Sequence, residues 1–300
     1  MAGTARQAVR RARWRAAVLW LALLAALPGV AVQLPAGAAA AGDGLSGTAG
    51  GPPLVISRPW PKSWFGSSRP LVLGADGSAL TPVWVDEFDR LSYRWTRYRG
   101  RPGGDPMGWW EPSQVSVSGG NLVLTGQVEA RGRGGDPTKR WVSGGVKLEH
   151  DLPPLRYGRA DVRLRAEPGP WALAVLLWPA DNRWPPEIDF VEDNGGDRGL
   201  VTATLHTGTG RARRAVRVTK KADFSRWHTW SVAWSPGKVV YLLDDVPWAT
   251  TTDAGVPATG MRLVVQLQAW PCHHGWYVTC PGPTTPPVRV YVDRVAVWTR

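Results

Sequence analysis

Residues 288–298 read VRVYVDRVAVW, and their apolar side chains alternate with other residues almost to the end of the chain. Because successive side chains of a β-strand point to opposite faces, this pattern predicts a strand with one face against a core. Shorter runs of the same kind occur earlier in the chain, at residues 121–125, 160–165, 201–206 and 239–243.

Turn-forming residues separate these runs, and the pair Asp244-Asp245 after the fourth run is typical of a hairpin turn. After the N-terminal region, no stretch shows helical periodicity. Many short alternating strands at regular intervals are typical of all-β proteins. The sequence therefore predicts a β-sandwich or barrel.

The first 41 residues have the composition of an export signal. Five Arg and no acidic residue lie within them, an apolar run follows at 16–27, and small residues fill 36–41. The apolar run is short for a bilayer span of about 20 residues, so we expect a cleaved signal peptide and a secreted protein, with an uncleaved anchor as the alternative. Residues 42–80 are rich in Gly, Pro and Ser and are interpreted as a linker, which leaves 81–300 as the folded domain.

Two features of the composition bear on function, the 19 Trp and the net charge of +12. Trp is a large, flat side chain that packs on the apolar faces of sugars and nucleobases. A basic surface attracts nucleic acid, anionic lipid or acidic polysaccharide, and it also serves solubility alone.

Acidic and apolar residues alternate in the stretch 187–192, which reads EIDFVE. In a strand, Glu187 and Asp189 share one face, and the apolar residues between them face a core. Strict alternation would bury Glu192 without a partner, which is costly. A β-bulge near residues 190–191 would return Glu192 to the face of Glu187, and bulges are frequent next to active sites.

Three carboxyl groups placed so closely cannot all ionise freely. One is then suited to act as an acid while another stays anionic. We expect the carboxyls of Glu187 and Glu192 to lie about 5–5.5 Å apart, as in glycosidases that retain the anomeric configuration. An ordinary acidic surface strand and a metal site built on the same acids are the alternatives.

The run that follows the turn at 193–197 places Thr202, Thr204 and His206 on one face. Hairpin pairing would set this polar face beside the carboxylates. His206 would then hydrogen-bond a carboxylate or a sugar hydroxyl, unless it is a plain surface residue.

The chain contains two cysteines, Cys272 and Cys280. In an exported protein this spacing suits a disulfide that staples a loop. Two free thiols are the alternative, and zinc binding with the neighbouring His273 and His274 matches no familiar ligand spacing.

These residues resemble family 16 of the glycoside hydrolases, whose hallmark is Glu-x-Asp-x-x-Glu. Glu187, Asp189 and Glu192 match the bulged form of this motif. Pro186 stands where the family often has Gly. The resemblance covers about residues 81–300 and includes, in family order, residues 84–89, 141–145, 157–160, 169–171, 177–179, 184–185, 224–230 and 292–295.

The resemblance implies a β-jelly roll of two curved antiparallel sheets with a concave substrate cleft. It implies Glu187 as the nucleophile, Glu192 as the general acid/base and Asp189 as the residue that orients and tunes the nucleophile. The bulged form is typical of laminarinase-like, agarase and carrageenase branches. We therefore expect a retaining endo-hydrolase of a β-linked polysaccharide, most plausibly a β-1,3-glucan.

Several other residues are candidates for binding. The Trp residues considered for sugar stacking are Trp110, Trp141, Trp171, Trp184, Trp270 and Trp276. The resemblance favours Trp171 and Trp184, and we expect Trp270 and His206 to join them at the substrate. Many relatives carry a structural calcium, and Asp293 matches their side-chain ligand; a solvated or turn-bonding Asp is the alternative.

The chemistry expected from these residues requires no cofactor. A transglycosylase and a non-catalytic carbohydrate-binding protein on the same fold are the competing functions. A basic, Trp-rich nucleic-acid binder would need cations interleaved with aromatics along a groove, and residues 211–214 (RARR) contain no aromatic. We therefore expect a monomeric protein that acts on a polysaccharide, with no nucleic-acid partner and no stable membrane association.

Overall fold

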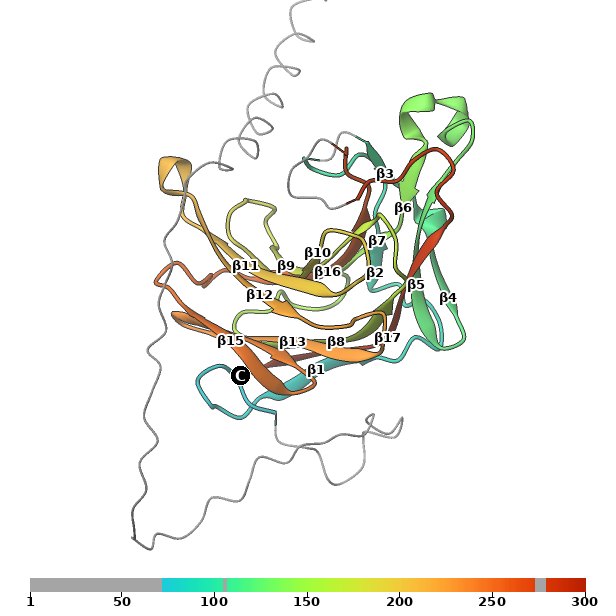
Figure 1. Ribbon diagram of the computed structural model, residues 1–300. Coiled ribbons are helices and arrows are strands. Elements are labelled where there is room, and N and C mark those ends of the chain that lie inside the picture. Colours follow the sequence, from blue (N-terminus) through green and yellow to red (C-terminus); the bar gives the residue numbers. More distant parts are fainter. Residues whose placement is uncertain (1–71, 105–106, 273–278) are drawn as a thin grey trace, which may run out of the picture. The chain divides into compact units, whose positions relative to one another are not determined.

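The computed structural model describes residues 72–104, 107–272 and 279–300. The predicted signal peptide and residues 42–71 of the predicted linker lie outside the described residues. Within them, the chain forms β-strands and short 3-10 helices that build two stacked sheets (Figure 1). All strand pairs are antiparallel except one, between β3 and β6. The prediction of an all-β sandwich is confirmed.

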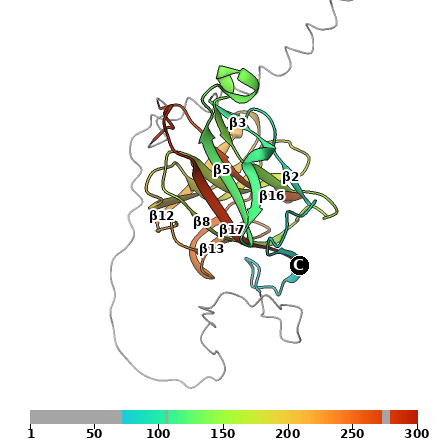
Figure 2. The ribbon, with the colours of Figure 1, turned by 90° about the vertical axis from the view of Figure 1, so that its right-hand side faces the viewer.

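The larger sheet has the order β15-β14-β13-β8-β17-β5-β6-β3, with β1 paired to β17 and β4 paired to β5. The neighbouring long strands β17 and β5 are seen side by side in Figure 2. The strands of this sheet are β1 (Thr81–Asp86), β3 (Gly108–Trp110), β4 (Val115–Ser118), β5 (Asn121–Val128), β6 (Trp141–Ser143), β8 (Gly158–Ala166), β13 (His228–Ser235), β14 (Lys238–Leu243), β15 (Val246–Thr252) and β17 (Val288–Thr299).

The smaller sheet has the order β12-β11-β10-β9-β16-β7-β2, so β10 lies near its middle and β12 at one edge. Its strands are β2 (Trp95–Arg97), β7 (Gly145–Leu148), β9 (Ala172–Pro179), β10 (Glu187–Asp193), β11 (Leu200–Thr207), β12 (Arg214–Lys221) and β16 (Met261–Gln268). The 3-10 helices are η1 (Pro112–Gln114), η2 (Arg133–Gly135), η3 (Pro137–Lys139) and η4 (Gly210–Ala212).

The main hydrophobic core lies between the two sheets and receives one face of each. It contains the apolar residues of β10, Ile188, Phe190 and Val191, all of them buried. Large aromatic side chains such as Trp230 and Trp234 fill the same core. Burying a side chain of this size stabilises the fold by about 1.5–3 kcal/mol, so the core fixes which face of each strand is turned outward.

Strand β17 departs from the uniform alternation predicted from its sequence. The register of its pairing with β8 shifts between Val292 and Arg294. Before the shift Val288, Val290 and Val292 are buried, and after it every residue from Arg294 to Trp298 is buried. The bulge adds one residue to the strand at Asp293 and Arg294. The valines before it and those after it therefore face the same core.

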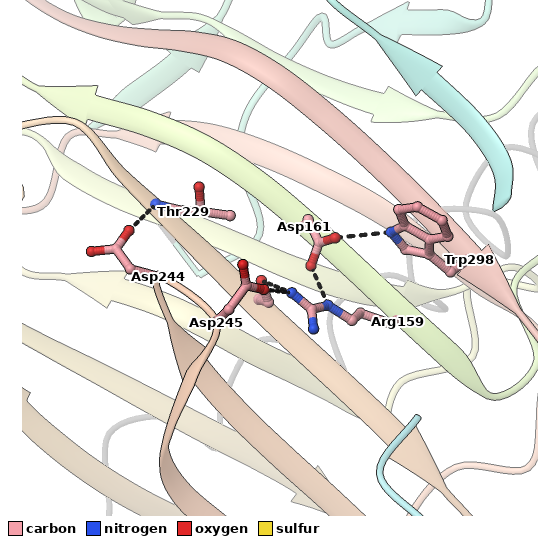
Figure 3. A network of polar contacts seen from close by, with 7 residues as sticks. Arg159, Asp161, Thr229, Asp244, Asp245 and Trp298 are labelled. Carbon is pink, nitrogen blue, oxygen red and sulfur yellow. Dashed lines mark hydrogen bonds and ion pairs between the residues drawn. The ribbon is translucent and has the colours of Figure 1, made fainter. Parts of the chain in front are cut away.

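The predicted hairpin turn at Asp244-Asp245 joins β14 to β15, and both residues have positive φ. A network of polar contacts ties this turn to the larger sheet (Figure 3). The buried Arg159 guanidinium lies between the carboxylates of Asp161 and Asp245, and Asp161 also accepts a hydrogen bond of 2.8 Å from the Trp298 indole. The turn is thereby anchored on β8 and β17.

Residues 72–80, the last part of the predicted linker, pack on the larger sheet. Val72 and Leu80 are buried against Ala296 and Trp298 of β17. None of the helices in the described part of the chain is long and apolar enough to cross a bilayer.

Candidate active site

The acidic residues of β10 lie on the face of the smaller sheet that is turned away from the core. Ile188, Phe190 and Val191 all point into the core, so two consecutive residues face the same side. In the pairing of β10 with β9, Asp189 lies opposite Leu176 and Val191 lies opposite the adjacent residue, Val175. Phe190 is therefore the extra residue of β10. The predicted β-bulge is therefore present at the predicted place.

The bulge brings all three acids to one face. Along β11, Glu187 is opposite His206, Asp189 is opposite Thr204, and Glu192 is opposite Thr202. These β11 residues are two apart and share a face, as the sequence predicted. The carboxylates and this polar row thus form one surface.

Glu187 and Glu192 each accept a hydrogen bond from a specific side chain. The indole Nε1 of Trp184 donates a hydrogen bond of 2.6 Å to Oε2 of Glu187. The Thr204 hydroxyl donates to Oε2 of Glu192. Nε2 of His206 lies 3.3 Å from Oδ2 of Asp189, but this oxygen accepts no hydrogen bond within the described residues, so the hydrogen bond predicted for His206 stays a prediction.

The electrostatics of the site follow from its burial. Desolvation, followed by repulsion from Asp189, raises the pKa of Glu187 well above its usual range. Desolvation and the Glu192 charge do the same to the pKa of Asp189, and desolvation raises the pKa of Glu192. Since three neighbouring carboxyls favour protonation, the group holds fewer than three negative charges near neutral pH.

His206 is neutral near pH 7. Desolvation lowers the pKa of its imidazole, although the carboxylates of Glu187 and Glu192 act in the opposite direction. Ligand atoms of Glu187, Asp189 and His206 lie within 4.8 Å of one another. They are the only set of three such residues in the described ranges with the spacing of a metal site.

Trp184 lies in the loop between β9 and β10 and is half-buried. Besides its bond to Glu187, its ring is 5.7 Å from the His206 ring, measured between centroids. The guanidinium of Arg213, from the loop before β12, lies 5.1 Å from the centroid of the indole. Trp184 therefore lies beside the carboxylates, and its stacking on a sugar stays a prediction.

Trp171 is not brought to this surface, which corrects the prediction that it stacks on substrate. Its side chain is completely buried in the core between the sheets. The ring lies on the backbone of Gly126 in β5, where a Cβ atom would come within 2.4 Å of the indole. With no exposed ring face, Trp171 supports the packing of the sandwich.

The other aromatic candidates differ in exposure. Trp270 is 7% exposed, and its Nε1 donates to Gln268 Oε1 over 3.1 Å, so at most an edge of its ring is open to a ligand. Trp110 and Trp141 are half-buried, and their Nε1 atoms donate to the carbonyls of Leu267 and Pro281. Trp276 lies outside the described residues.

Asp293 lies on the larger sheet, where its carboxylate pairs with Arg163 at 2.5 Å. A guanidinium in this position competes with a cation for the same oxygen, and no second carboxylate joins Asp293 in a metal-ligand set within the described residues. The side chains around Asp293 therefore do not fit a calcium site as they lie. A structural calcium stays a prediction from the family resemblance.

Cys272 and Cys280 form a disulfide, which confirms the staple predicted from their spacing. The bridge follows β16 and precedes Pro281, whose carbonyl accepts the Trp141 indole hydrogen bond of 2.8 Å. It ties the chain after β16 to the neighbourhood of β6.

Three residues near the carboxylates were not predicted. Arg198 is fully buried in the β10–β11 turn, where it pairs with Asp193 and donates to the Glu167 carbonyl. Arg217 on β12 lies opposite Thr204 of β11. Applying the alternation of faces to residues 214–221 as a further strand would have predicted its position beside the carboxylates. No sequence signal identifies Arg213, because its contact with Trp184 depends on the path of a loop.

Comparison with known proteins supports the family resemblance. The family model described as "Glycosyl hydrolases family 16" matches residues 110–279. An endo-1,3-1,4-beta-glycanase, ExsH of Rhizobium meliloti (strain 1021), is 29% identical over an alignment of 230 residues, which covers 65% of this chain and 47% of ExsH. The chain thus spans about half the length of this curated relative.

Two further proteins extend the comparison. A glucan endo-1,3-beta-glucosidase of Cryptopygus antarcticus is 26% identical over an alignment of 196 residues, which covers 56% of this chain and 67% of that protein. The crystal structure of the endo-beta-1,3-glucanase from Pyrococcus furiosus superposes with a TM-score of 0.64 at 21% identity, covering 77% of this chain and 98% of that one. At this identity the structural likeness establishes the fold.

Proposed function

Since the chain belongs to family 16 of the glycosyl hydrolases, we propose that it is an endo-acting hydrolase that cleaves β-1,3 linkages in a glucan with retention of configuration. The observation that carries this proposal is the bulge in β10, which sets Glu192 on the face of Glu187 and Asp189. The names of the curated relatives support a β-1,3 or mixed-linkage glucan as the backbone.

In the proposed reaction Glu187 attacks the anomeric carbon as an anionic carboxylate. Burial raises the pKa of Glu187, and the nearby His206 and the Trp184 N–H that donates to Oε2 act in the opposite direction and favour the anion. The bond formed is between Glu187 and the sugar, and the bond broken is to the leaving glycosyl oxygen.

Glu192 acts as the general acid and then as the general base. Burial raises its pKa, which favours the protonated form that delivers a proton to the leaving oxygen. In the second step the Glu192 carboxylate takes a proton from water, which displaces Glu187 from the sugar. The Thr204 hydroxyl holds Glu192 in both steps.

Asp189 and His206 position these groups. Asp189 is 3% exposed, and with its raised pKa it carries the proton that reduces repulsion between the carboxyls. Neutral His206, close to Asp189 Oδ2, supports Asp189 without adding a positive charge that would depress the pKa of the acid.

We also propose that residues 1–41 are removed on export and that the mature protein is a monomer. N-terminal sequencing and light scattering of protein recovered from the medium test both points. An intact N-terminus or a stable dimer would contradict them.

The release of reducing ends from laminarin, lichenan, agarose, carrageenan and xyloglucan tests the function. We expect release from laminarin, products that initially carry the β-configuration by NMR, and loss of turnover in Glu187→Gln while binding persists. Turnover unchanged by the substitution would overturn the mechanism. Release from none of these polymers would overturn the proposed substrate. Longer products in the presence of acceptor oligosaccharides would indicate a transglycosylase.

A further inference from the structure

The segment that joins β11 to β12, together with β12 itself, is strongly basic. Residues 208–222 contain four Arg and two Lys and no acidic residue. Arg214 is paired with Asp253 of the larger sheet, which neutralises one of these charges. The rest of this basic segment, residues 208–222, lies along one edge of the smaller sheet.

Part of the basic segment faces the same side as the catalytic acids. Arg217 is opposite Thr204 on β11, and Thr204 is opposite Asp189 on β10. Lys221 is opposite Leu200 and shares this face, because it is four residues from Arg217. Both side chains belong to exposed residues. The row of carboxylates is therefore flanked by a row of cations two strands away.

Arg213 brings a further cation to the other end of the row. Its guanidinium lies over the ring of Trp184, the residue that donates to Glu187. Stacking covers one face of the guanidinium and leaves its edge, which carries the N–H donors, able to bind an anion. Cations that serve only solubility would be scattered over the surface, whereas Arg213 is placed on a residue of the active site.

Burial raises the pKa values of Asp189 and Glu192, and the charge of Arg217 acts in the opposite direction on both. The hydroxyls of a neutral glycan accept hydrogen bonds from a guanidinium but gain no net charge attraction from it. An anionic glycan is repelled by the carboxylates, and cations on the same face of the sheet offset this repulsion. Toward the other edge of the same sheet, Lys147 on β7 is paired with Glu149 at 2.9 Å, which neutralises its charge.

We propose that the basic segment is a subsite for acidic substituents, so that the natural substrate is a β-linked glycan carrying monoanionic groups. The shared chemistry is a carboxylate or a sulfate ester that accepts hydrogen bonds from Arg213 and Arg217. This inference rests on the proposed function and narrows its substrate class.

The test uses one glucan backbone in three forms: laminarin, carboxymethylated laminarin and sulfated laminarin of matched length. The ratio of kcat/KM for a charged form to kcat/KM for the neutral form is measured at low and at high salt. We expect a ratio above one at low salt that falls as salt screens the charges. Preference for the carboxymethylated or the sulfated form identifies the anion.

Arg217→Gln and Arg213→Gln are each expected to lower this ratio about tenfold, the loss expected for one hydrogen bond to a charged group. Arg289→Gln on the larger sheet is the matched control and should leave the ratio unchanged. A second readout needs no turnover. The Kd of Glu187→Gln protein for carboxymethylated laminarin oligosaccharides should rise about tenfold when Arg217→Gln is added.

The two proposals fail in different ways. Hydrolysis of neutral laminarin with no preference for a charged form, or an equal fall of the ratio in all three Arg variants, overturns the acidic subsite and leaves the hydrolase standing. Tight, salt-sensitive and Arg217-dependent binding without cleavage of any form upholds the subsite and overturns the hydrolase.

Discussion

At the residue scale, Trp184 has two possible roles, stacking on a sugar and hydrogen bonding to Glu187. Its sequence context does not distinguish them, but its contacts do. A Trp before the acidic segment is a candidate for stacking on a sugar. In the structure its Nε1 donates to Glu187, and its ring is held between Arg213 and His206. Trp184 is therefore a positioning residue for the proposed nucleophile as well as an aromatic surface.

Trp184→Phe keeps the ring and removes the donor. Because the hydrogen bond favours anionic Glu187, its loss raises the pKa of Glu187, and the acidic limb of the kcat/KM profile should move to higher pH. We expect kcat to fall about tenfold, as for loss of a hydrogen bond to a charged group. Trp248→Phe on β15 is the control. A lower kcat with an unmoved acidic limb would show that the ring alone matters.

Asp189→Asn tests the burial of charge among the carboxyls. The pKa of Asp189 is raised in the folded protein, so its contribution to stability is complete below the ordinary value of 3.8 and is lost as pH rises through the folded pKa. Removing the carboxylate should stabilise the fold by about 2 kcal/mol at pH 8 and very little at pH 4. Thermal unfolding at both pH values measures this. A variant less stable than the wild type at pH 8 would refute the assignment.

Sequence alone predicted some residues of the site and missed others for physical reasons. The cost of burying Glu192 was enough to predict its face, because that argument needs only strand geometry. Trp171 was misplaced, since a ring beside a strand can pack inward or outward, and the outcome depends on a glycine 45 positions earlier in the chain. Arg213 was missed because it lies in a loop, where no repeating pattern of residues predicts which side chains are in contact.

At the element scale, the bulges in β10 and β17 show when the alternation of apolar and polar residues predicts correctly which side chains face the core. In β10 the bulge was predicted because an acid fell on the core side. In β17 the adjacent Asp293 and Arg294 carried a similar signal, yet uniform alternation was expected there. In both β10 and β17, strict alternation would place a charged side chain in the core, and this is evidence for an extra residue in the strand.

Deleting Val191 tests whether hydrolysis requires only that both glutamates share one face of β10, or also requires the bulge between them. Without the extra residue, the second Glu is four positions from Glu187, so regular alternation still puts it on the carboxylate face. We expect a folded protein that is destabilised by about 1.5–3 kcal/mol through the lost valine and retains measurable hydrolysis. Deleting Phe190 and Val191 together reverses the face and should abolish both folding and activity. A folded but inactive single deletion would show that the bulge geometry is required.

At the scale of the whole molecule, strand patterns predicted the two-sheet class, and the order of strands came only with the structure. Pairings between distant segments, such as β16 with β9, depend on how the whole core fills. The position of β12 beside β11 belongs to this level, and it places the basic residues 208–222 beside the row of carboxylates.

The disulfide is a whole-molecule constraint whose effect can be measured. Cross-linking a loop of this length, with a sequence separation of 8, stabilises a fold by about 2–3 kcal/mol through the unfolded state. The double variant Cys272→Ser/Cys280→Ser should unfold about 5–10 °C lower. A reducing agent should lower the Tm of the wild type equally and leave the double variant unchanged. An unaltered Tm in the double variant would contradict this account.

The roles of the two glutamates on β10 are the centre of this account, and azide rescue tests them directly. With an activated aryl β-laminaribioside, Glu187→Ala plus azide should yield the α-glycosyl azide, because azide occupies the nucleophile's place. Glu192→Ala plus azide should yield the β-glycosyl azide through the covalent intermediate. NMR of the products distinguishes the two anomers. The reverse assignment, or no rescue of either folded variant, would contradict the account.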